Sequence, residues 1–458
     1  MFQQASTTIV ALTTPPGAGA IGIIRLSGPD AIAITDKIFK GKRLADQPSH
    51  TIHFGHIINT KDKLIDEVVV SIYRNPKSYT GEDVTEISCH GSSYILQEVI
   101  NACIAAGAVS AKPGEFTQRA FLNGKMDLAQ AEAVADLIAA ENKASHEIAL
   151  NQMRGGVSSE LAQLREQLIN FTALIELELD FSEEDVEFAD RKELMVFIQD
   201  LKSRVQALIT SFEYGNAIKN GVPVAIIGKP NAGKSTLLNA LLKEERAIVS
   251  EIAGTTRDVI EETVNIEGIT FRFIDTAGIR DTEDVIEAIG VERARQKLTQ
   301  AKVVIHLYEQ DHKLLDELSD ELKGKIVFNL VSKVDHNQWP NDRYELFLKE
   351  HYPGYHHFGI SVKTGFNLDL LTRTLVYHFK NEVAGNAVII TNLRHKEALE
   401  KAKAALEEVA DGMNRQLSGD LLSLHLKEAL YYLGTITGKI DVDRDILGAI
   451  FGKFCIGK

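Results

Sequence analysis

Residues 222–235 decide the fold of this chain, and they read V-P-V-A-I-I-G-K-P-N-A-G-K-S. The run from Gly228 to Ser235 matches the pattern G-x-x-x-x-G-K-[ST] at every fixed position. An apolar segment precedes the pattern, and residues 236–242, which have helical character, follow it. The sequence therefore predicts a strand, a phosphate-binding loop and a helix in that order, rather than a chance glycine turn.

The residue types in this loop suit a nucleotide and a magnesium ion. Gly228 and Gly233 let the backbone curl so that its N–H groups face phosphate oxygens, and the start of the helix adds its dipole. Lys234 is expected to reach the β- and γ-phosphates, and the hydroxyl of Ser235 can ligate Mg²⁺. The predicted nucleotide contacts of the loop are Asn231, Ala232, Gly233, Lys234, Ser235 and Thr236.

Two further segments are expected to reach the phosphates. An aspartate follows the apolar run 271–274, where it can hold the magnesium shell, and a nearby glycine can donate its N–H to the γ-phosphate. Between this segment and the phosphate loop, Thr256 can supply a second hydroxyl to the metal in the triphosphate state. The predicted contacts are Ser250, Glu251, Ile252, Ala253, Gly254, Thr255, Thr256, Asp275, Thr276, Ala277 and Gly278.

Recognition of the base is predicted to come from two later loops. Asp335 follows the apolar run 326–331 and can accept from the two N–H groups on the edge of guanine, a contact that adenine does not offer. Because the wrong base leaves this carboxylate unpaired, the discrimination can be large. The predicted contacts are Lys333, Asp335, Ser361, Val362 and Lys363.

In this order the segments resemble the translation-factor-related GTPases, with two departures. Ser332 stands where the N-K-x-D motif of that class has Asn, which leaves open how the base loop is stabilised. Ile279 stands where Ras carries the glutamine that orients the attacking water. Since isoleucine has neither a donor nor an acceptor, another group must take that role. Arg257 and Arg280 are candidates, and a monovalent cation can instead neutralise charge between the phosphates.

The chain has 458 residues, which at about 150 residues per domain predicts about three domains. Residues 1–118 have the short apolar runs and dense turn residues of a mixed, β-rich domain. Residues 119–217 and 381–458 are predicted to be helical. The clearest apolar stripe at helical spacing consists of Leu161, Leu164, Leu168, Phe171 and Ile175.

Residues 218–380 alternate short apolar runs with helical segments, as in a doubly wound sheet. The predicted strands are 222–227, 271–274, 303–307, 326–331 and 357–360. The predicted fold class is therefore multidomain, α/β plus all-α. It has an N-terminal α+β domain and a Ras-like P-loop domain inserted between the two parts of a discontinuous helical domain.

Composition, net charge and cysteine count exclude several classes of protein. The net charge is -14, so a nucleic-acid partner would have to bind a local basic patch. Cys89, Cys103 and Cys455 cannot form a disulfide framework, and no CxxC pair suggests zinc. No apolar stretch approaches the roughly 20 residues of a membrane-spanning helix, and the N-terminus lacks the features of a secretory signal. We therefore expect a protein of the reducing cytoplasm that does not bind membranes.

Several strings spread over the whole chain resemble the MnmE (also called TrmE) family of tRNA-modification GTPases. They are P-P-G at 15–17, G-I-I-R-L-S-G at 22–28, Y-T-G-E-D at 79–83, A-K-P-G-E-F-T at 111–117, R-A-F-L-N-G-K at 119–125 and F-C-I-G-K at 454–458. The closing C-I-G-K is highly specific to that family.

The resemblance implies a folate-binding N-terminal domain that also forms a homodimer. It implies a reaction as well. In a heterotetramer with the flavoprotein MnmG (GidA), the family installs an aminomethyl or carboxymethylaminomethyl group at C5 of the wobble uridine of certain tRNAs. A 5-formyl- or methylene-tetrahydrofolate supplies the one-carbon unit, and the modification needs GTP hydrolysis.

The resemblance also assigns residues to the folate site. Arg25, Glu82, Lys125 and Lys458 match the family's folate contacts. Arg and Lys suit the glutamyl carboxylates, and Glu82 can pair with N–H donors of the pterin. Cys455 matches a cysteine near the one-carbon site, in a role that is either chemical or positional.

A second set of matched residues concerns GTP hydrolysis. Asn231, Ser250, Ile252 and Thr255 match the family's potassium ligands, Ile252 through its carbonyl. Ser235 and Thr256 are the predicted Mg²⁺ ligands. Glu287 matches the glutamate that orients the attacking water. The predicted catalytic residues are Glu287, Lys234 and Cys455.

Two other functions stay open from the sequence. The first is a GTP-dependent switch in ribosome assembly or RNA binding, which would need neither a folate-like domain nor the terminal C-I-G-K. The second is an ATPase for partitioning or transport, which Asp335 and the loop 254–258 disfavour.

Overall fold

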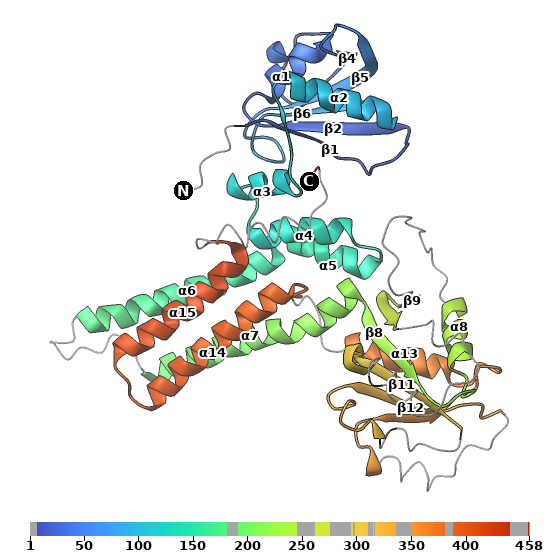
Figure 1. The fold of residues 1–458 in the computed structure, drawn as a ribbon. Helices are drawn as coiled ribbons and strands as arrows, with labels where there is room; N and C mark the ends of the chain where they lie inside the picture. The colour runs from blue at the N-terminus through green and yellow to red at the C-terminus, as the bar shows by residue number, and fades with distance from the viewer. Residues whose placement is uncertain are drawn as a thin grey trace. The chain divides into compact units, whose positions relative to one another are not determined.

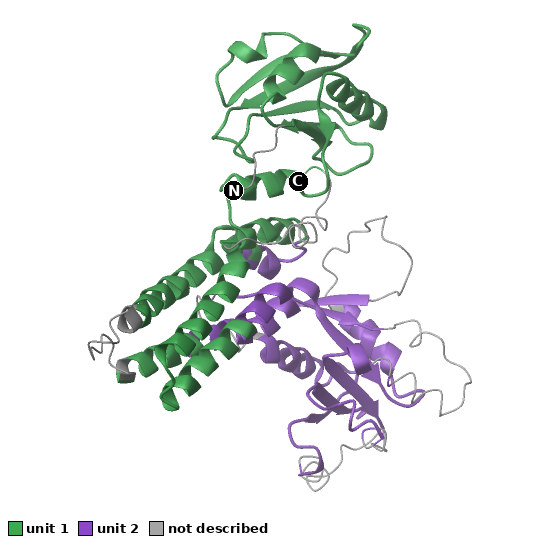
Figure 2. Cartoon of the chain, turned by 60° about the vertical axis from the view of Figure 1, so that its left-hand side comes forward, with its two compact units in different colours: residues 1–139, 149–202, 401–458 green, residues 140–148, 203–400 purple. Residues whose placement is uncertain are grey.

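The computed structural model describes residues 7–180, 191–244, 262–274, 295, 298–309, 315, 317–335, 350–380, 388–439 and 457. The chain divides into two compact units, shown in Figure 2. Unit 1 consists of residues 1–139, 149–202 and 401–458, and unit 2 of residues 140–148 and 203–400.

The N-terminal part of unit 1 is built on a seven-stranded sheet with the order β3-β4-β5-β6-β2-β1-β7. Its pairs are antiparallel except β1 with β7. The strands are β1 (Ile9–Leu12), β2 (Ile21–Ser27), β3 (Phe39–Lys40), β4 (Thr51–Ile58), β5 (Leu64–Tyr73), β6 (Val84–His90) and β7 (Val109–Ser110).

One face of this sheet is covered by α1 (Ala31–Ile38) and α2 (Ser93–Ala105), as Figure 1 shows, and the short 3-10 helix Leu44–Asp46 follows β3. Side chains of β5 alternate between this covered face and the other, so Val68, Val70 and Ile72 are buried. They pack with apolar residues of both helices into one core. The prediction of a mixed, β-rich domain is confirmed.

The other described segments of unit 1 are mainly helical, and three helices have residues in both units. The helices are α3 (Glu115–Leu122), α4 (Leu128–Ile138), α5 (Lys143–Met153), α6 (Gly156–Asp180), α7 (Arg191–Asn220), α14 (Leu393–Asn414) and α15 (Gly419–Thr437). A capping box starts α4, in which Asp127 accepts from the backbone N–H of Gln130 and Gln130 accepts from that of Asp127.

The predicted apolar stripe is confirmed on α6, where Leu161, Leu164, Leu168 and Ile175 are fully buried. Helix α6 packs along α15, far away in the sequence. Beside the apolar contact, Lys427 forms an ion pair of 2.5 Å with Glu176. The pairing of α6 with α15 therefore brings two distant parts of the chain into one helical layer.

Unit 2 contains a six-stranded sheet with the order β13-β12-β11-β8-β10-β9. All pairs are parallel except β9 with β10. The elements are β8 (Val222–Ile227), α8 (Lys234–Glu244), β9 (Glu262–Ile266), β10 (Ile269–Phe273), β11 (Val303–Tyr308), β12 (Ile326–Val331), β13 (His356–Gly359) and α13 (Leu368–Lys380).

Apolar clusters cover both faces of this sheet, as a doubly wound fold requires. On one face Ile305 packs with residues of α8 and α13, and on the other Val304 packs with Leu298 and Leu318. The five predicted strands are confirmed within one or two residues at their ends. Strand β9 was not predicted, because it lies at an edge and alternates two buried residues, Val264 and Ile266, with polar ones.

The boundary between the two units runs through α5, α7 and α14, so a cut at a single residue does not separate them. The domain limits at 118, 217 and 380 therefore stay predictions. Within the part of the chain that the structure describes, no helix has the length and apolar character needed to cross a bilayer.

Replacing Leu168 by Ala is expected to lower the free energy of unfolding of the helical layer by about 2–5 kcal/mol, because it opens a cavity in a closed contact. The matched control is Ile169→Ala in the same turn, since Ile169 is 48% exposed whereas Leu168 is fully buried. Urea titrations followed by far-ultraviolet circular dichroism measure both. Equal shifts of the midpoint would contradict the packing of α6.

Candidate functional site

The phosphate loop connects β8 to α8 at the carboxyl end of the parallel sheet. Gly228 has φ +148°, and a Cβ added there would lie 2.2 Å from the carbonyl oxygen of Leu307 in β11. Asn231 and Gly233 also have positive φ, at 62° and 97°. The loop therefore needs glycine at Gly228 for the close approach, and it turns through a left-handed conformation before α8 begins.

The side chain of Lys234 folds over this loop. Its Nζ donates to the carbonyl oxygens of Gly228 and Lys229, each at 2.8 Å. Ser235 is half-buried in the first turn of α8, and Asn231 is exposed in the loop. The structure thus gathers an ammonium group, a hydroxyl and the amino end of a helix at one point, which is the donor set that a polyphosphate requires.

The two predicted base loops lie side by side. The hydroxyl of Ser361 donates to Oδ1 of Asp335 at 2.7 Å, and the backbone N–H of Val334 donates to the carbonyl of Ile360 at 3.3 Å. Val362 packs against the apolar core of unit 2, whereas Lys363 is exposed. The loop after β12 and the loop after β13 are therefore joined through the carboxylate assigned to guanine.

Ser332, the residue that departs from the N-K-x-D pattern, has a defined place. It is buried, and its backbone N–H and hydroxyl both donate to the carbonyl of Tyr308, at 2.8 and 3.3 Å. The next residue, Lys333, has φ 59° and forms an ion pair of 2.6 Å with Glu309. The serine thus anchors the start of the base loop to the end of β11.

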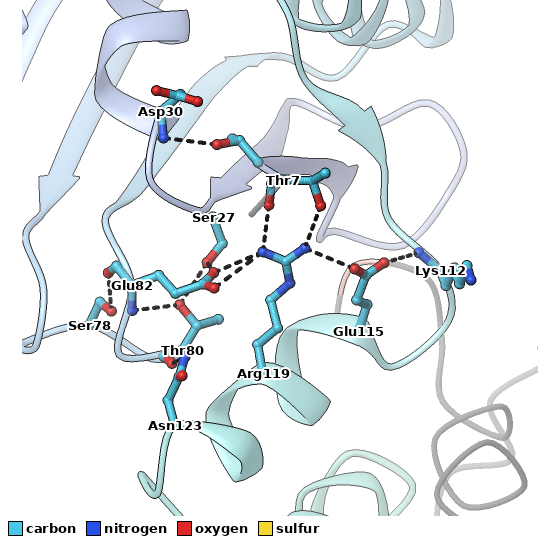
Figure 3. Close-up of polar contacts among 11 residues, drawn as sticks. Thr7, Ser27, Asp30, Ser78, Thr80, Glu82, Lys112, Glu115, Arg119 and Asn123 are labelled. Carbon is cyan, nitrogen blue, oxygen red and sulfur yellow. Dashed lines mark hydrogen bonds and ion pairs between the residues drawn. The ribbon is translucent and has the colours of Figure 1, made fainter. Parts of the chain in front are cut away.

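A second polar cluster lies in the N-terminal part of unit 1, around the loop that connects β5 to β6 (Figure 3). Glu82 of this loop accepts from the hydroxyl of Ser27 at 2.7 Å and from Nη1 of Arg119 at 3.1 and 3.2 Å. Lys125 donates to the carbonyl of Pro76 in the same loop at 3.0 Å.

Arg25 also lies beside the loop that connects β5 to β6. Its guanidinium forms an ion pair of 2.8 Å with Glu86, its partner across strands β2 and β6. The group also lies 5.4 Å from the ring centroid of Tyr79 and 5.6 Å from that of Phe116. The structure therefore brings three of the four predicted folate residues, Arg25, Glu82 and Lys125, around one loop.

Several members of this cluster were not predicted as site residues, namely Ser27, Thr80, Glu86, Glu115 and Arg119. Glu115 and Arg119 form an i,i+4 ion pair of 3.0 Å in α3. That spacing is visible in the sequence as a helical pair, but it is equally common on solvated surfaces. Burial, which the spacing does not reveal, distinguishes this pair, because the side chain of Arg119 is only 3% exposed.

Burial raises the pKa of three groups in the N-terminal domain, one in this cluster and two in the apolar core. It raises the pKa of Tyr79 above its ordinary value, against the opposing effects of the Thr117 hydrogen bond and the Arg25 charge. Burial also raises the pKa of Cys89 to about 11 and that of Cys103 to about 12. Both thiols are free and buried, so they stay protonated at neutral pH.

The remaining predicted site residues lie outside the described part of the chain. They are Ser250, Glu251, Ile252, Ala253, Gly254, Thr255, Thr256, Asp275, Thr276, Ala277, Gly278, Glu287, Cys455 and Lys458, together with Arg257, Ile279 and Arg280. Of the C-terminal tetrapeptide the structure describes Gly457, which is buried. A Cβ added there would lie 2.1 Å from the carbonyl oxygen of Leu12 in β1.

Comparison with known proteins covers nearly the whole chain. Residues 8–125 match the family model described as GTP-binding protein TrmE N-terminus, and residues 128–455 match the MnmE helical domain. A protein of Cytophaga hutchinsonii described as tRNA modification GTPase MnmE is 53% identical over 98% of this chain and 98% of its own length. The chain belongs to the MnmE family.

Other relatives with the same description agree with this assignment. The protein of Bacteroides fragilis is 52% identical and that of Christiangramia forsetii 49%, each over 98% of this chain and 99% of its own length. As a member of the MnmE family, the protein is a GTP hydrolase that acts in tRNA modification. The predicted family, enzyme class and general function are confirmed, and the ribosome-assembly and ATPase alternatives are set aside.

Replacing Ser361 by Ala is expected to weaken GTP binding by about tenfold, because a hydrogen bond to a charged group contributes about 1.5–3 kcal/mol. The loss should be specific to guanine nucleotides, since the hydroxyl acts on Asp335. Thr364→Ala is the control, because Thr364 is exposed in the same loop and offers Ser361 only its backbone N–H. Titration calorimetry with GTP measures both, and equal affinities would contradict the joined base loops.

Proposed function

We propose that this GTPase depends on potassium and uses a tetrahydrofolate one-carbon unit to build a carboxymethylaminomethyl or aminomethyl group at C5 of the wobble uridine (U34) of certain tRNAs. The observation that carries the proposal is the polar cluster around Glu82. A nucleotide switch has no need of this buried group of charges, which lies in the domain that matches the TrmE N-terminus.

At the nucleotide site, the positively charged groups are proposed to bind the phosphates, and the hydroxyl and carboxylate groups to bind the metal. Lys234 neutralises the β- and γ-phosphates, and the amino end of α8 stabilises the same negative charge. The hydroxyls of Ser235 and Thr256 are the proposed ligands of Mg²⁺, with Asp275 in its outer shell. Ser235 fits this role because it lies in the first turn of the helix that follows the loop. The metal supplies charge stabilisation when GTP is bound.

Asn231 is the described member of the proposed potassium site. It is exposed in the phosphate loop, and the other proposed ligands are Ser250, Ile252 and Thr255. An amide oxygen, two hydroxyls and a carbonyl form an all-oxygen set of the kind that K⁺ accepts. The cation would supply the positive charge that an arginine supplies elsewhere, and Glu287 would orient the water in place of the glutamine that Ile279 replaces.

At the second site, Arg25, Glu82, Lys125 and Lys458 are proposed to bind the folate. Glu82 fits a pterin, because a fixed carboxylate accepts from adjacent N–H groups. Arg25 is already paired with Glu86, so its charge is shared between that carboxylate and the ligand. The packing of Gly457 against Leu12 supports a tail that reaches this domain, which would bring Cys455 and Lys458 near the one-carbon unit.

The proposed partners follow from this chemistry. We propose a homodimer formed through the N-terminal domain, which assembles with the flavoprotein MnmG (GidA) into a heterotetramer in the cytoplasm. The flavoprotein supplies the redox chemistry for which the described residues have no group, and the tRNA supplies the uridine. The test is mass spectrometry of wobble nucleosides in tRNA from cells that lack this protein. A normal content of modified uridine would overturn the proposal.

GTP turnover is expected to be at least about tenfold faster in KCl than in NaCl of equal ionic strength, because K⁺ supplies the charge that an arginine supplies elsewhere. Phosphate release measures the two rates at saturating Mg²⁺. Asn231→Ala should remove most of the difference, since it deletes one potassium ligand. Equal rates of the wild type in the two salts would exclude this cation site.

Deleting Cys455–Lys458 is expected to abolish wobble modification and to leave GTP hydrolysis largely intact. The tail would hold the one-carbon donor beside its acceptor, which is an entropic contribution that four residues can make. The truncated protein is scored by phosphate release and by the modified-nucleoside content of its tRNA. A frayed terminus predicts normal modification. Loss of both activities would mean that the tail stabilises the fold.

A further inference from the structure

Arg119 is the most deeply buried charged residue in the described part of the chain. Its side chain is 3% exposed, and among the described Asp, Glu, Lys and Arg residues the next most buried are Glu132 and Asp66, which are 8% and 9% exposed. A buried charge is costly unless it is paired and hydrogen-bonded. The burial of Arg119 therefore calls for an explanation in the groups that surround it.

Those groups hold both ends of the guanidinium fork. Nη1 donates to the backbone carbonyl of Thr7 at 2.8 Å and to both carboxylate oxygens of Glu82 at 3.1 and 3.2 Å. Nη2 donates to Glu115 at 3.0 Å. Figure 3 shows the guanidinium between the two carboxylates. A planar fork with fixed donors sets the position of each partner, which a lysine ammonium does not do.

Glu82 is held from further sides. Its Oε2 accepts from the hydroxyl of Ser27 at 2.7 Å, and its backbone N–H donates to the hydroxyl of Thr80 at 3.2 Å. The carbonyl of Glu82 accepts from Ser78 at 2.6 Å. The side chain of Glu82 nevertheless keeps 12% of its surface exposed. A ligand can therefore still reach a carboxylate whose position is already fixed.

The hydrogen bonds divide unequally between the two oxygens of Glu82. Oε2 accepts from Ser27 and Arg119, whereas Oε1 accepts from Arg119 at the longer distance of 3.2 Å. A carboxylate oxygen has two acceptor positions. Among the described residues, Oε1 is thus the oxygen with fewer hydrogen bonds and the greater remaining capacity for a ligand N–H.

We propose that Arg119 is the positioning residue of the folate site: it fixes Glu82 so that Oε1 can accept from the 2-amino group of the pterin. This inference rests on the proposed folate function of Glu82. Arg119 does not touch the ligand. It acts through Glu82, while Glu115 holds Nη2 of the guanidinium and the carbonyl of Thr7 holds Nη1.

The test is a double-mutant cycle in which one change removes the 2-amino group of the ligand and the other replaces Glu82 or Arg119 in the protein. Calorimetry on the full-length protein compares 5-formyl-tetrahydrofolate with its 2-deamino analogue, which lacks the proposed donor. The wild type is expected to lose about tenfold in affinity when the amino group is removed, and Glu82→Gln should lose much less. In Arg119→Lys, which keeps the charge without the fork, the loss should shrink to less than about threefold.

A merely structural role of Arg119 would weaken both ligands equally and leave their ratio unchanged, and that result would overturn the proposal. Arg43→Lys is the matched control, because Arg43 is 73% exposed in the same domain and should keep the wild-type ratio. If Arg119→Lys does not fold, Glu115→Ala decides, since it loosens the fork and should reduce the ratio. An unchanged ratio there would also overturn the positioning role.

The same experiment distinguishes the proposed folate function of the site from the positioning role of Arg119. If the wild type does not bind 5-formyl-tetrahydrofolate, the folate function is overturned, and the positioning role with it. If the wild type binds and distinguishes the two ligands while Arg119→Lys keeps the full ratio, the folate function stands and only the role of Arg119 is wrong.

Discussion

The end of β11 is the constraint on which the nucleotide site depends. Its carbonyl at Leu307 approaches Gly228 so closely that no side chain fits between them, and its next carbonyl, at Tyr308, accepts both donors of Ser332. Because β11 lies between β8 and β12, two consecutive residues fix the phosphate loop and the base loop relative to each other. The parallel sheet therefore fixes the spacing between the loop that binds the triphosphate and the loop that binds the base.

The sequence predicts this half of the molecule well, for a physical reason. A phosphate loop must combine a buried strand, two glycines and a helix start within a few residues, so its requirements are local and visible in the order of residues. The strand β9 was missed because an edge strand buries only one face and leaves no apolar run. The substitution at Ser332 was visible, but its role depends on the carbonyl of Tyr308, which is distant in sequence.

The N-terminal cluster shows the opposite case. Resemblance to a family predicted Arg25, Glu82 and Lys125, and the structure brings them around one loop. The resemblance did not predict that Glu86 would pair with Arg25 or that Arg119 would form an ion pair with Glu82. Such pairs form between strands or between a loop and a helix, and the residue types involved are ordinary on any surface. Only burial separates a fixed charge from a solvated one, and burial is a property of the whole fold.

The buried thiols in the core of the N-terminal sheet have a practical consequence. The chain has three cysteines, and two of them, Cys89 and Cys103, have pKa values raised to about 11 and about 12 by burial. Reagents that attack the thiolate react slowly with such groups. Cys455 is therefore the remaining thiol for a maleimide dye, and the natural sequence needs no engineered cysteine to place a fluorescent reporter on its C-terminal tetrapeptide.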